Sequence, residues 1–441
     1  MDFQPVKGTR DFYPDEMALR NWITDAWRRV SRRNGFVEYD GPVMEYLDLY
    51  RVKSGDEIVS QLFAFTDRGG RQLALRPEIT PTLARMVNAK INSLPRPIKW
   101  FSVPRLFRAE NPQKGRLREF FQWNIDVIGS DDVLADAECI FTCVDFLREV
   151  GLAPDDVQVR IGSRPLTMAM LRKVGTPAES MDAALAALDK RPKVSAEAFA
   201  ELAGKAGIPA DRIGDVCEFQ DAPDTAGVKQ ALGPDERTAG DLAKLEQLQV
   251  VLAQMGAAEY CRLDMRIVRG LAYYTGIVYE VFDAQGELRA IAGGGRYDNL
   301  LEVLGGPKVG ATGFGMGDAV LGILLQEKWK REGKAPDLSD RLDAFVIGSG
   351  QSGLEAVLRV VGALRRGGWA TDFSTKSNVG KAMKEANRRN ARRAIIVGDD
   401  TAGVKDLASG QQIEVPRADF LADPGRYLKQ GETPGGGPTA V

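Results

Sequence analysis

The sequence predicts an α+β core, in which helices flank an antiparallel sheet, followed by a smaller, doubly wound α/β domain. Three observations support this fold class. Alternating apolar residues recur in short segments between residues 61 and 129, and such segments return at 260–294. Residues 166–256 are instead rich in Ala, Leu, Lys and Glu at helical spacing. Beyond residue 341, strand and helix patterns alternate, which is typical of a parallel sheet.

The first part of the core is predicted from helical and alternating periodicity. A helix is expected over residues 15–34, with Gly35 at its end, and a second over about 131–151, which ends at Gly151. Alternating or short apolar segments predict the strands of the sheet. These segments are FVEYDGPVME (36–45), QLFAFTD (61–67), RQLALRPE (71–78), IKWFSVPRLFR (98–108) and EFFQWNIDVIG (119–129).

Changes in composition set the expected domain boundaries. The core occupies residues 1–165 and resumes at 257–330, and a helical domain is inserted at 166–256. A polar, proline-containing joint at 331–340 leads to the α/β domain at 341–425, and residues 426–441 are expected to be disordered. The α/β domain carries a basic cluster, which can face either a phosphate backbone or solvent. It consists of Lys381, Lys384, Arg388, Arg389, Arg392 and Arg393.

Composition limits the function. The 441 residues are enough for two or three domains, and no apolar run approaches the roughly 20 residues of a membrane-spanning helix. The N-terminus lacks the pattern of a secretory signal, so we expect no membrane segment and a cytoplasmic location. The net charge of −2 gives no overall basic footprint, so a nucleic-acid partner would have to use local patches.

The chain contains no histidine, and its four cysteines form no C-x-x-C pair. This composition excludes nucleophilic catalysis by Ser-His or Cys-His pairs and any histidine-ligated metal. Only oxygen ligands remain for a metal, and these suit Mg²⁺. We assign no metal-ligating residue.

The region from Phe107 to Gly129 encloses a loop dense in charged residues. Arg108, Arg116 and Arg118 can neutralise phosphate oxygens through bidentate hydrogen bonds. The acidic residues Glu110 and Glu119 can orient those guanidinium groups. A charge run of this kind taken alone is more often a solvated hairpin, so the interpretation depends on the rest of the chain.

The run FRAENPQKGRLREFFQ (107–122) resembles motif 2 of the class II aminoacyl-tRNA synthetases in its histidine-type form. Four further segments resemble signatures of the histidyl-tRNA synthetase family in the same order along the chain. They are KGTRDFYPDE (7–16), LRPEIT (75–80), VRGLAYYTGIVYE (268–280) and AGGGRYDNLL (292–301). The resemblance extends from the N-terminus to about residue 320 and continues more weakly beyond.

This resemblance implies the class II synthetase sheet and a C-terminal anticodon-binding domain. It also implies ATP-dependent ligation of L-histidine to tRNA(His) through a histidyl-adenylate intermediate, with ATP as substrate and Mg²⁺ as cofactor. The helix and strand around Gly35 resemble motif 1, which forms the dimer interface in these enzymes, so a homodimer is implied.

The resemblance to these motifs also implies roles for individual residues. Arg108 and Arg269 match the catalytic arginines, and Arg108, Glu110 and Arg116 match residues that bind ATP. Matches to the histidine site comprise residues around its amino group and residues around its imidazole. They are Glu78, Thr80, Gln122, Asp126, Tyr273, Tyr274 and Tyr297.

The sequence departs from the family pattern in three places. Ala272 replaces an Asp that is common in the RGLDYY form of the signature. Asp126 stands where many members have a longer Glu. Val320 stands where motif 3 usually presents an arginine to the γ-phosphate of ATP. Two substitutes for that arginine are open at this stage: Arg296, which we include among the ATP-binding residues, and Asp318 acting through Mg²⁺.

Two other functions remain as alternatives. One is a catalytically inactive paralogue that serves as a histidine-binding regulatory subunit. The other is an RNA-binding or translation-control protein that retains the fold with a decayed site. The regulatory paralogue usually lacks the C-terminal tRNA domain and the motif 2 arginine set, both of which this chain has. The decayed site is disfavoured by the joint presence of Arg108, Glu110, Arg269, Glu78 and Gln122, because the fold alone does not require these residues.

Overall fold

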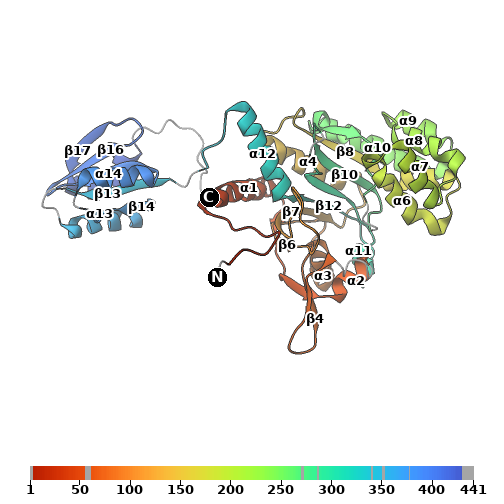
Figure 1. Cartoon of the computed structure of the whole chain (residues 1–441), viewed down its shortest axis with the longest axis horizontal. Helices are drawn as coiled ribbons and strands as arrows, with labels where there is room; N and C mark the ends of the chain where they lie inside the picture. The colour runs from red at the N-terminus through yellow and green to blue at the C-terminus, as the bar shows by residue number, and fades with distance from the viewer. Residues whose placement is uncertain are drawn as a thin grey trace. The chain divides into compact units, whose positions relative to one another are not determined.

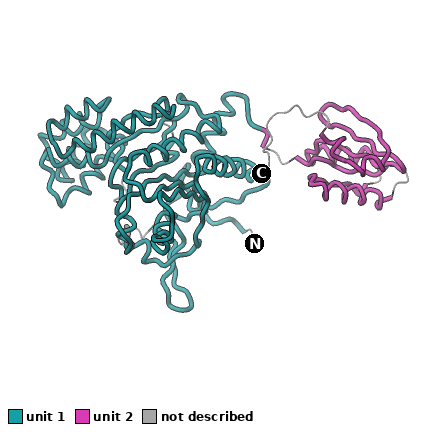
Figure 2. The backbone as a smooth tube through the Cα atoms, turned by 180° about the vertical axis from the view of Figure 1, so that it is seen from behind, with its two compact units in different colours: residues 1–336 teal, residues 337–441 magenta. Residues whose placement is uncertain are grey.

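The computed structural model describes residues 3–54, 61–269, 273–285, 288–338, 341–349, 353–376 and 378–429. The chain forms two compact units, residues 1–336 and 337–441 (Figure 2). No helix within the described ranges is both long enough and apolar enough to cross a membrane.

The larger unit is built on a nine-stranded sheet. Its six central strands are all antiparallel to their neighbours, which confirms the predicted antiparallel sheet. In spatial order they are β5 (Ile98–Ser102), β7 (Glu119–Ile128), β12 (Ala311–Gly317), β11 (Ala292–Arg296), β10 (Ile277–Asp283) and β8 (Val157–Ser163). Strands β1 (Val37–Glu38) and β9 (Cys261–Leu263) extend the two edges in parallel, and β6 (Arg105–Phe107) forms a hairpin with β7.

Strand β7 shows how the sequence gives the sheet two different faces. Successive side chains of a strand point to opposite faces. Trp123, Ile125 and Val127 therefore lie in the main hydrophobic core, whereas the alternate residues Asn124 and Asp126 face the other side. This alternation is the pattern that predicted the strand.

Three helices cover the apolar face of the sheet: α1 (Pro14–Arg33), α4 (Val133–Glu149) and α12 (Asp318–Glu332). Trp27 of α1 stacks on Trp123 of β7 with ring centroids 6.1 Å apart, and Phe146 of α4 lies 5.3 Å from Trp123. The Asp132 side chain caps α4 by accepting a hydrogen bond from the Leu134 amide. The first two helices fall within two residues of their predicted bounds.

A small three-stranded sheet lies beside the main one and consists of β2 (Met44–Tyr46), β4 (Gln72–Leu75) and β3 (Ala64–Thr66). The β3–β4 hairpin projects from the unit in Figure 1. Three helices accompany it: α2 (Asp48–Ser54), α3 (Thr80–Lys90) and α11 (Leu300–Val303). The β4–α3 connection brings residues 76–80 to the hydrophilic face of the main sheet, because Phe107 in the hairpin donates its amide hydrogen to the Arg76 carbonyl.

The inserted segment is helical, and Figure 1 shows α6 to α9 gathered at one end of the unit. Its helices are α5 (Arg164–Lys173), α6 (Met181–Lys190), α7 (Ala196–Lys205), α8 (Ile213–Gln220), α9 (Thr225–Leu232) and α10 (Glu236–Gln254). Short 3-10 segments lie at Ala178–Ser180, Arg191–Lys193, Ala210–Arg212 and Ala258–Tyr260. The helices begin two residues before the expected start and end two before the expected end.

The second unit begins with the expected alternation: β13 (Leu342–Gly348), α13 (Leu354–Arg366), β14 (Thr371–Phe373), α14 (Val379–Arg388) and β15 (Ala391–Val397). Strands β14, β13 and β15 are parallel. Two antiparallel strands that we did not predict, β16 (Thr401–Asp406) and β17 (Gln412–Pro416), complete the sheet, and α15 (Arg417–Ala422) and α16 (Pro424–Leu428) follow. Residues 426–428 are thus helical rather than disordered, and the rest of the predicted tail, from 430, lies outside the described residues.

Candidate active site

A cavity of about 520 Å³ opens on the hydrophilic face of the large sheet. Its walls come from the β4–α3 connection, the β6–β7 hairpin, strand β7, and the segments around β10, β11 and β12. The cavity brings together all the predicted site residues except one. Those that line it are Glu78, Thr80, Arg108, Glu110, Arg116, Gln122, Asp126, Arg269, Tyr273, Tyr274 and Tyr297.

Glycines make the cavity possible by leaving the middle of the sheet without side chains. Asp126 of β7 pairs in register with Gly313 of β12, and a Cβ atom on Gly313 would lie 2.4 Å from the Asp126 Oδ1 atom. A Cβ atom on Gly293 of β11 would lie 2.2 Å from an Nη1 atom of Arg269. The glycine-rich signature therefore serves close approach of polar side chains to the backbone, rather than a turn.

Arg108 follows directly after β6 and points into the cavity. Its Nε atom donates a hydrogen bond to the Pro77 carbonyl at 3.1 Å, and its guanidinium lies 5.0 Å from the centre of the Phe120 ring. Burial lowers the pKa of Arg108, although the neighbouring Glu78 and Glu110 oppose that shift. An arginine remains protonated at neutral pH even so, and Arg108 therefore supplies a fixed positive charge.

The loop between β6 and β7 (residues 108–118), called the charged loop below, folds back over the cavity. Arg116 forms an ion pair with Glu110, and Gly115 adopts a left-handed conformation with φ of 74°. A Cβ atom on Gly115 would lie 2.9 Å from the Cγ2 atom of Val320. The residue that departs from the family pattern in motif 3 thus lines the cavity directly beneath the tip of this loop.

Arg269 reaches the cavity from the segment before β10. Its backbone is in the left-handed region, with φ of 55°, which is uncommon for a residue other than glycine and often marks a functional position. Its guanidinium forms an ion pair with Glu280 of β10 and lies 5.7 Å from the centre of the Tyr274 ring. Its Nε atom is buried and has no hydrogen-bond partner among the described residues. The next residues of this signature, 270–272, lie outside the described part of the chain.

One end of the cavity is aromatic and acidic. The Tyr297 hydroxyl donates a hydrogen bond to the Asp126 carboxylate. Burial and the neighbouring Asp126 charge raise the pKa of Tyr297 well above its usual value, so this phenol stays neutral and acts as a donor. The Tyr273 ring lies 4.6 Å from that of Tyr274 and 5.9 Å from that of Tyr297.

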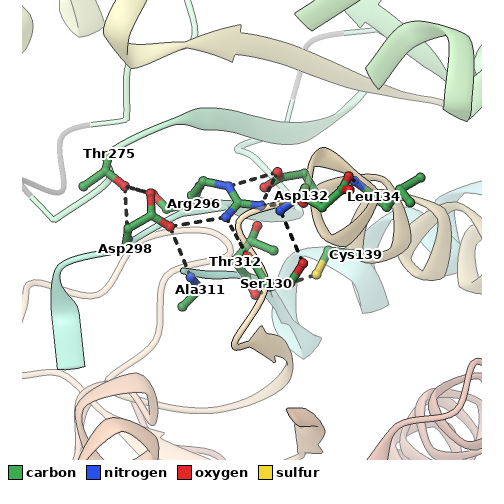
Figure 3. Close-up of polar contacts among 10 residues, drawn as sticks. Ser130, Asp132, Leu134, Cys139, Thr275, Arg296, Asp298, Ala311 and Thr312 are labelled. Carbon is green, nitrogen blue, oxygen red and sulfur yellow. Dashed lines mark hydrogen bonds and ion pairs between the residues drawn. The ribbon is translucent and has the colours of Figure 1, made fainter. Parts of the chain in front are cut away.

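Arg296 is the predicted site residue that the structure places elsewhere, since it does not line the cavity. Figure 3 shows its polar contacts with other parts of the protein. Its guanidinium contacts Asp136 at 2.6 and 3.0 Å, Asp298 at 3.3 Å, and the carbonyls of Ser130 and Asp132 at 2.9 Å each. These contacts use all five N–H donors of an arginine. We therefore withdraw Arg296 as an ATP ligand, because it has no donor left for a phosphate.

Asp318 is also engaged in the protein. Its carboxylate accepts a hydrogen bond from the Phe121 amide at 2.9 Å and pairs with Arg10 at 2.6 Å. It is 5% exposed and is not among the residues that line the cavity. Neither possible substitute for the missing motif 3 arginine thus fits the observed geometry.

Two residues that shape the site were not predicted from the sequence. Glu280 pairs with Arg269 and could have been found as the acidic residue that ends the TGIVYE segment. The hydroxyl of the partly buried Tyr39 is shielded from solvent, and its burial followed by the Asp126 charge raises the pKa of Tyr39 well above the usual value. Tyr39 stands in the FVEYDG segment, where nothing in the sequence signals a site residue.

A family model for histidyl-tRNA synthetase matches residues 8–318, which is more than half of the chain. The chain belongs to the histidyl-tRNA synthetase family. A second model, for an anticodon-binding domain, matches residues 343–423 in the C-terminal unit.

Curated relatives and solved structures agree with this family. A histidine–tRNA ligase of Opitutus terrae is 42% identical, over 95% of this chain and 97% of its own length. A chloroplastic/mitochondrial histidine–tRNA ligase of Arabidopsis thaliana is 40% identical, over 95% of this chain and 86% of its own length. A crystal structure of histidyl-tRNA synthetase from Nostoc aligns with a TM-score of 0.80 and 23% identity, over 97% and 99% of the two chains. The last likeness concerns the fold and confirms the predicted class II architecture.

Proposed function

We propose that this member of the histidyl-tRNA synthetase family ligates L-histidine to tRNA(His) with ATP. The observation that carries the proposal is the convergence of Arg108, Arg269 and the Asp126–Tyr297 pair on one cavity in a chain of this family. The chemistry needs two steps. The histidine carboxylate attacks the α-phosphorus of ATP, which gives histidyl-adenylate and releases pyrophosphate. A hydroxyl of the terminal tRNA ribose then attacks the acyl carbon and releases AMP.

The arginines suit the first step because it transfers an adenylyl group from pyrophosphate to the histidine carboxylate without a covalent enzyme intermediate. Such a step depends on positioning and on stabilising the charge that develops on phosphate oxygens. We assign Arg108 and Arg269 to the α-phosphate and the histidine carboxylate, and Glu110 and Arg116 to the nucleotide. Buried guanidinium groups can do this without a proton transfer.

Mg²⁺ belongs to the proposal as a companion of ATP. Among the residues that the structure describes, no group of three or more acidic or cysteine side chains could hold a metal. Mg²⁺ is commonly held by one or two carboxylates together with substrate phosphates. The cavity offers Glu110 as such a carboxylate, and the ion would shield the charge of the triphosphate.

Recognition of histidine is assigned to the aromatic and acidic end. The Asp126 carboxylate can accept a hydrogen bond from one imidazole nitrogen, while Glu78, Thr80 and Gln122 surround the place for the amino group. A site built from buried polar groups rejects isosteres strongly, because a ligand that lacks the matching group leaves them unpaired. The Tyr297 hydrogen bond fixes the orientation of the Asp126 carboxylate.

ATP–pyrophosphate exchange with each amino acid in turn tests this function. We expect exchange with histidine only, followed by charging of tRNA(His). The regulatory-subunit alternative predicts histidine binding by calorimetry without exchange, and a protein with a decayed site predicts neither result. No contact among the described residues favours those two alternatives over the synthetase.

Replacing Tyr297 by phenylalanine should raise the KM for histidine about tenfold, because the buried Asp126 carboxylate loses a donor. The KM for ATP should change less than twofold. A matched control is Tyr279→Phe, since the Tyr279 hydroxyl is also buried but has no hydrogen-bond partner among the described residues. Equal effects of the two substitutions on the KM for histidine would contradict the assignment of Tyr297.

A homodimer is the proposed assembly. Apolar side chains are exposed on β1, β2, β3 and the segment between β1 and β2, and a second copy of the chain would cover them. They are Val37 (63%), Val43 (43%), Met44 (51%), Tyr46 (57%) and Phe65 (42%). Sedimentation equilibrium should give twice the chain mass, and Met44→Asp combined with Tyr46→Asp should give the monomer. A monomeric wild-type protein at micromolar concentration would contradict this assembly.

The C-terminal unit is the proposed contact for the anticodon arm of tRNA(His). Only some residues of its basic cluster are available for this contact. Arg393 is buried and Arg389 pairs with Asp372 at 2.8 Å. The side chains of Lys381, Lys384 and Arg388 are exposed. We place the reaction in the cytoplasm, where tRNA and ATP are available.

A further inference from the structure

The charges that line the cavity do not by themselves favour a triphosphate. Three arginines (Arg108, Arg116 and Arg269) face three carboxylates (Glu78, Glu110 and Asp126). Arg116 is paired with Glu110, and Arg269 with Glu280 outside the lining. A highly charged ligand such as ATP therefore needs additional cations at the rim of the cavity.

The place beneath the charged loop supplies no such cation. Val320 lines the cavity here with an apolar side chain, and it packs against Gly115 of the loop. Arg296 and Asp318, as described above, are engaged with other residues and lie outside the lining. The additional positive charge has to come from another segment.

Arg289 is in the right place to provide it. This exposed residue precedes β11, and the next two residues, Ala290 and Ile291, line the cavity. Its Nη2 atom donates a hydrogen bond to the Gln113 side-chain oxygen at the tip of the charged loop. Segments on two sides of the cavity thus meet through a single guanidinium, and within the described ranges no carboxylate forms an ion pair with Arg289.

We propose that Arg289 binds the outer phosphates of ATP and replaces the motif 3 arginine that is absent at Val320. The inference rests on the proposed function and assigns a phosphate ligand within the same site. When ATP binds, the Arg289 guanidinium exchanges a neutral amide, Gln113, for charged phosphate oxygens. That exchange is favourable, because a planar guanidinium forms bidentate, charge-assisted hydrogen bonds with phosphate. The exposed side chain gives up little other bonding to make the change.

ATP–pyrophosphate exchange at saturating histidine separates this role from simple anchoring of the loop. For Arg289→Gln we expect the KM for ATP to rise about 10- to 100-fold, the range for loss of hydrogen bonds to a charged group. The KM for histidine should stay within twofold of the wild-type value. Arg289→Lys should recover part of the loss, because a lysine keeps the charge but not the planar fork.

Two further variants serve as controls. Gln113→Ala removes the resting partner of Arg289 and should leave the KM for ATP unchanged or lower it. Arg262→Gln removes another exposed arginine, on β9, and should have no effect. The proposal is overturned by an unchanged KM for ATP in Arg289→Gln, or by an equal rise in Gln113→Ala, which would indicate loop anchoring alone.

A failure of the proposed function gives a different result. If the wild-type protein shows no histidine-dependent exchange, titration calorimetry with Mg²⁺-ATP on the wild-type and Arg289→Gln proteins still tests the inference. Weaker ATP binding in the variant supports the assignment of Arg289. Equal binding, or no binding to either protein, refutes it.

Discussion

Replacing Arg269 by alanine is expected to slow histidine-dependent ATP–pyrophosphate exchange by at least about 10³-fold, on the scale of losing an arginine that stabilises phosphoryl transfer. The structure gives three reasons. Arg269 is held in a left-handed backbone conformation, its guanidinium packs against the backbone of Gly293, and Glu280 fixes its direction. A charge positioned in this way needs no reorganisation during the reaction, which is what makes it effective.

Glu280, whose side chain is only 19% exposed, loses its ion-pair partner in this variant. A buried charge without its partner is destabilising, so the folding of the variant has to be checked separately. Circular dichroism and a thermal melt of the variant provide that check. Arg269→Lys should also lose most activity, since an ammonium cannot present two parallel donors. Arg266→Ala is the matched control, because Arg266 stands three residues earlier and pairs with Asp264. Exchange by Arg269→Ala within tenfold of the wild-type rate would remove Arg269 from the catalytic assignment.

Most of this site was predicted because the family motifs imply roles for individual residues. Gln122 and Asp126 were assigned by that match, and alternation along the strand EFFQWNIDVIG puts them on the face opposite Trp123 and Ile125. The structure places them so. Helix α1 was predicted within one residue because its apolar positions and Gly35 agree on its bounds.

The same alternation could have corrected the assignment of Arg296. Neighbouring residues at the end of a strand point to opposite faces, so Arg296 and Tyr297 were not both free to face the cavity. What the sequence could not supply is the partner of Arg296. Asp136 is 160 residues away, and only the pairing of β11 with β12 and the docking of α4 bring the two together. The contact of Arg289 with Gln113, 176 residues apart, is hidden for the same reason.

Strands β16 and β17 were missed for a different reason. The segment QIEVP is exposed at nearly every position, since β17 is the edge strand of its sheet. Its apolar residues are only Ile413 and Val415, an alternation too short to predict a strand on its own, and the preceding segment TAGVKD (401–406) has a single large apolar residue, Val404. The mixed sheet of the C-terminal unit is therefore a consequence of pairing, which local sequence does not encode.

Removing the Arg296 guanidinium should strongly destabilise the larger unit. Arg296→Met is expected to cost about 3–5 kcal/mol, because it leaves the Asp136 carboxylate, 1% exposed, as an uncompensated buried charge. The loss of these contacts affects several elements of the unit. Asp298 accepts hydrogen bonds from the Thr275 hydroxyl at 3.0 Å and the Ala311 amide at 3.2 Å, so Arg296 connects α4, β11, β12 and the segment before β10.

The midpoint of the first unfolding transition in urea, followed by near-ultraviolet circular dichroism, measures this effect. A double variant, Arg296→Met with Asp136→Leu, should recover much of the loss, since a buried ion pair replaced by apolar side chains is often close to neutral. Arg331→Met, which breaks the half-exposed contact with Asp156 at 2.7 Å, should cost less than about 1 kcal/mol. If Arg296→Met unfolds at the wild-type midpoint but raises the KM for ATP, Arg296 acts as a nucleotide ligand after all and the network in Figure 3 rearranges when ATP binds.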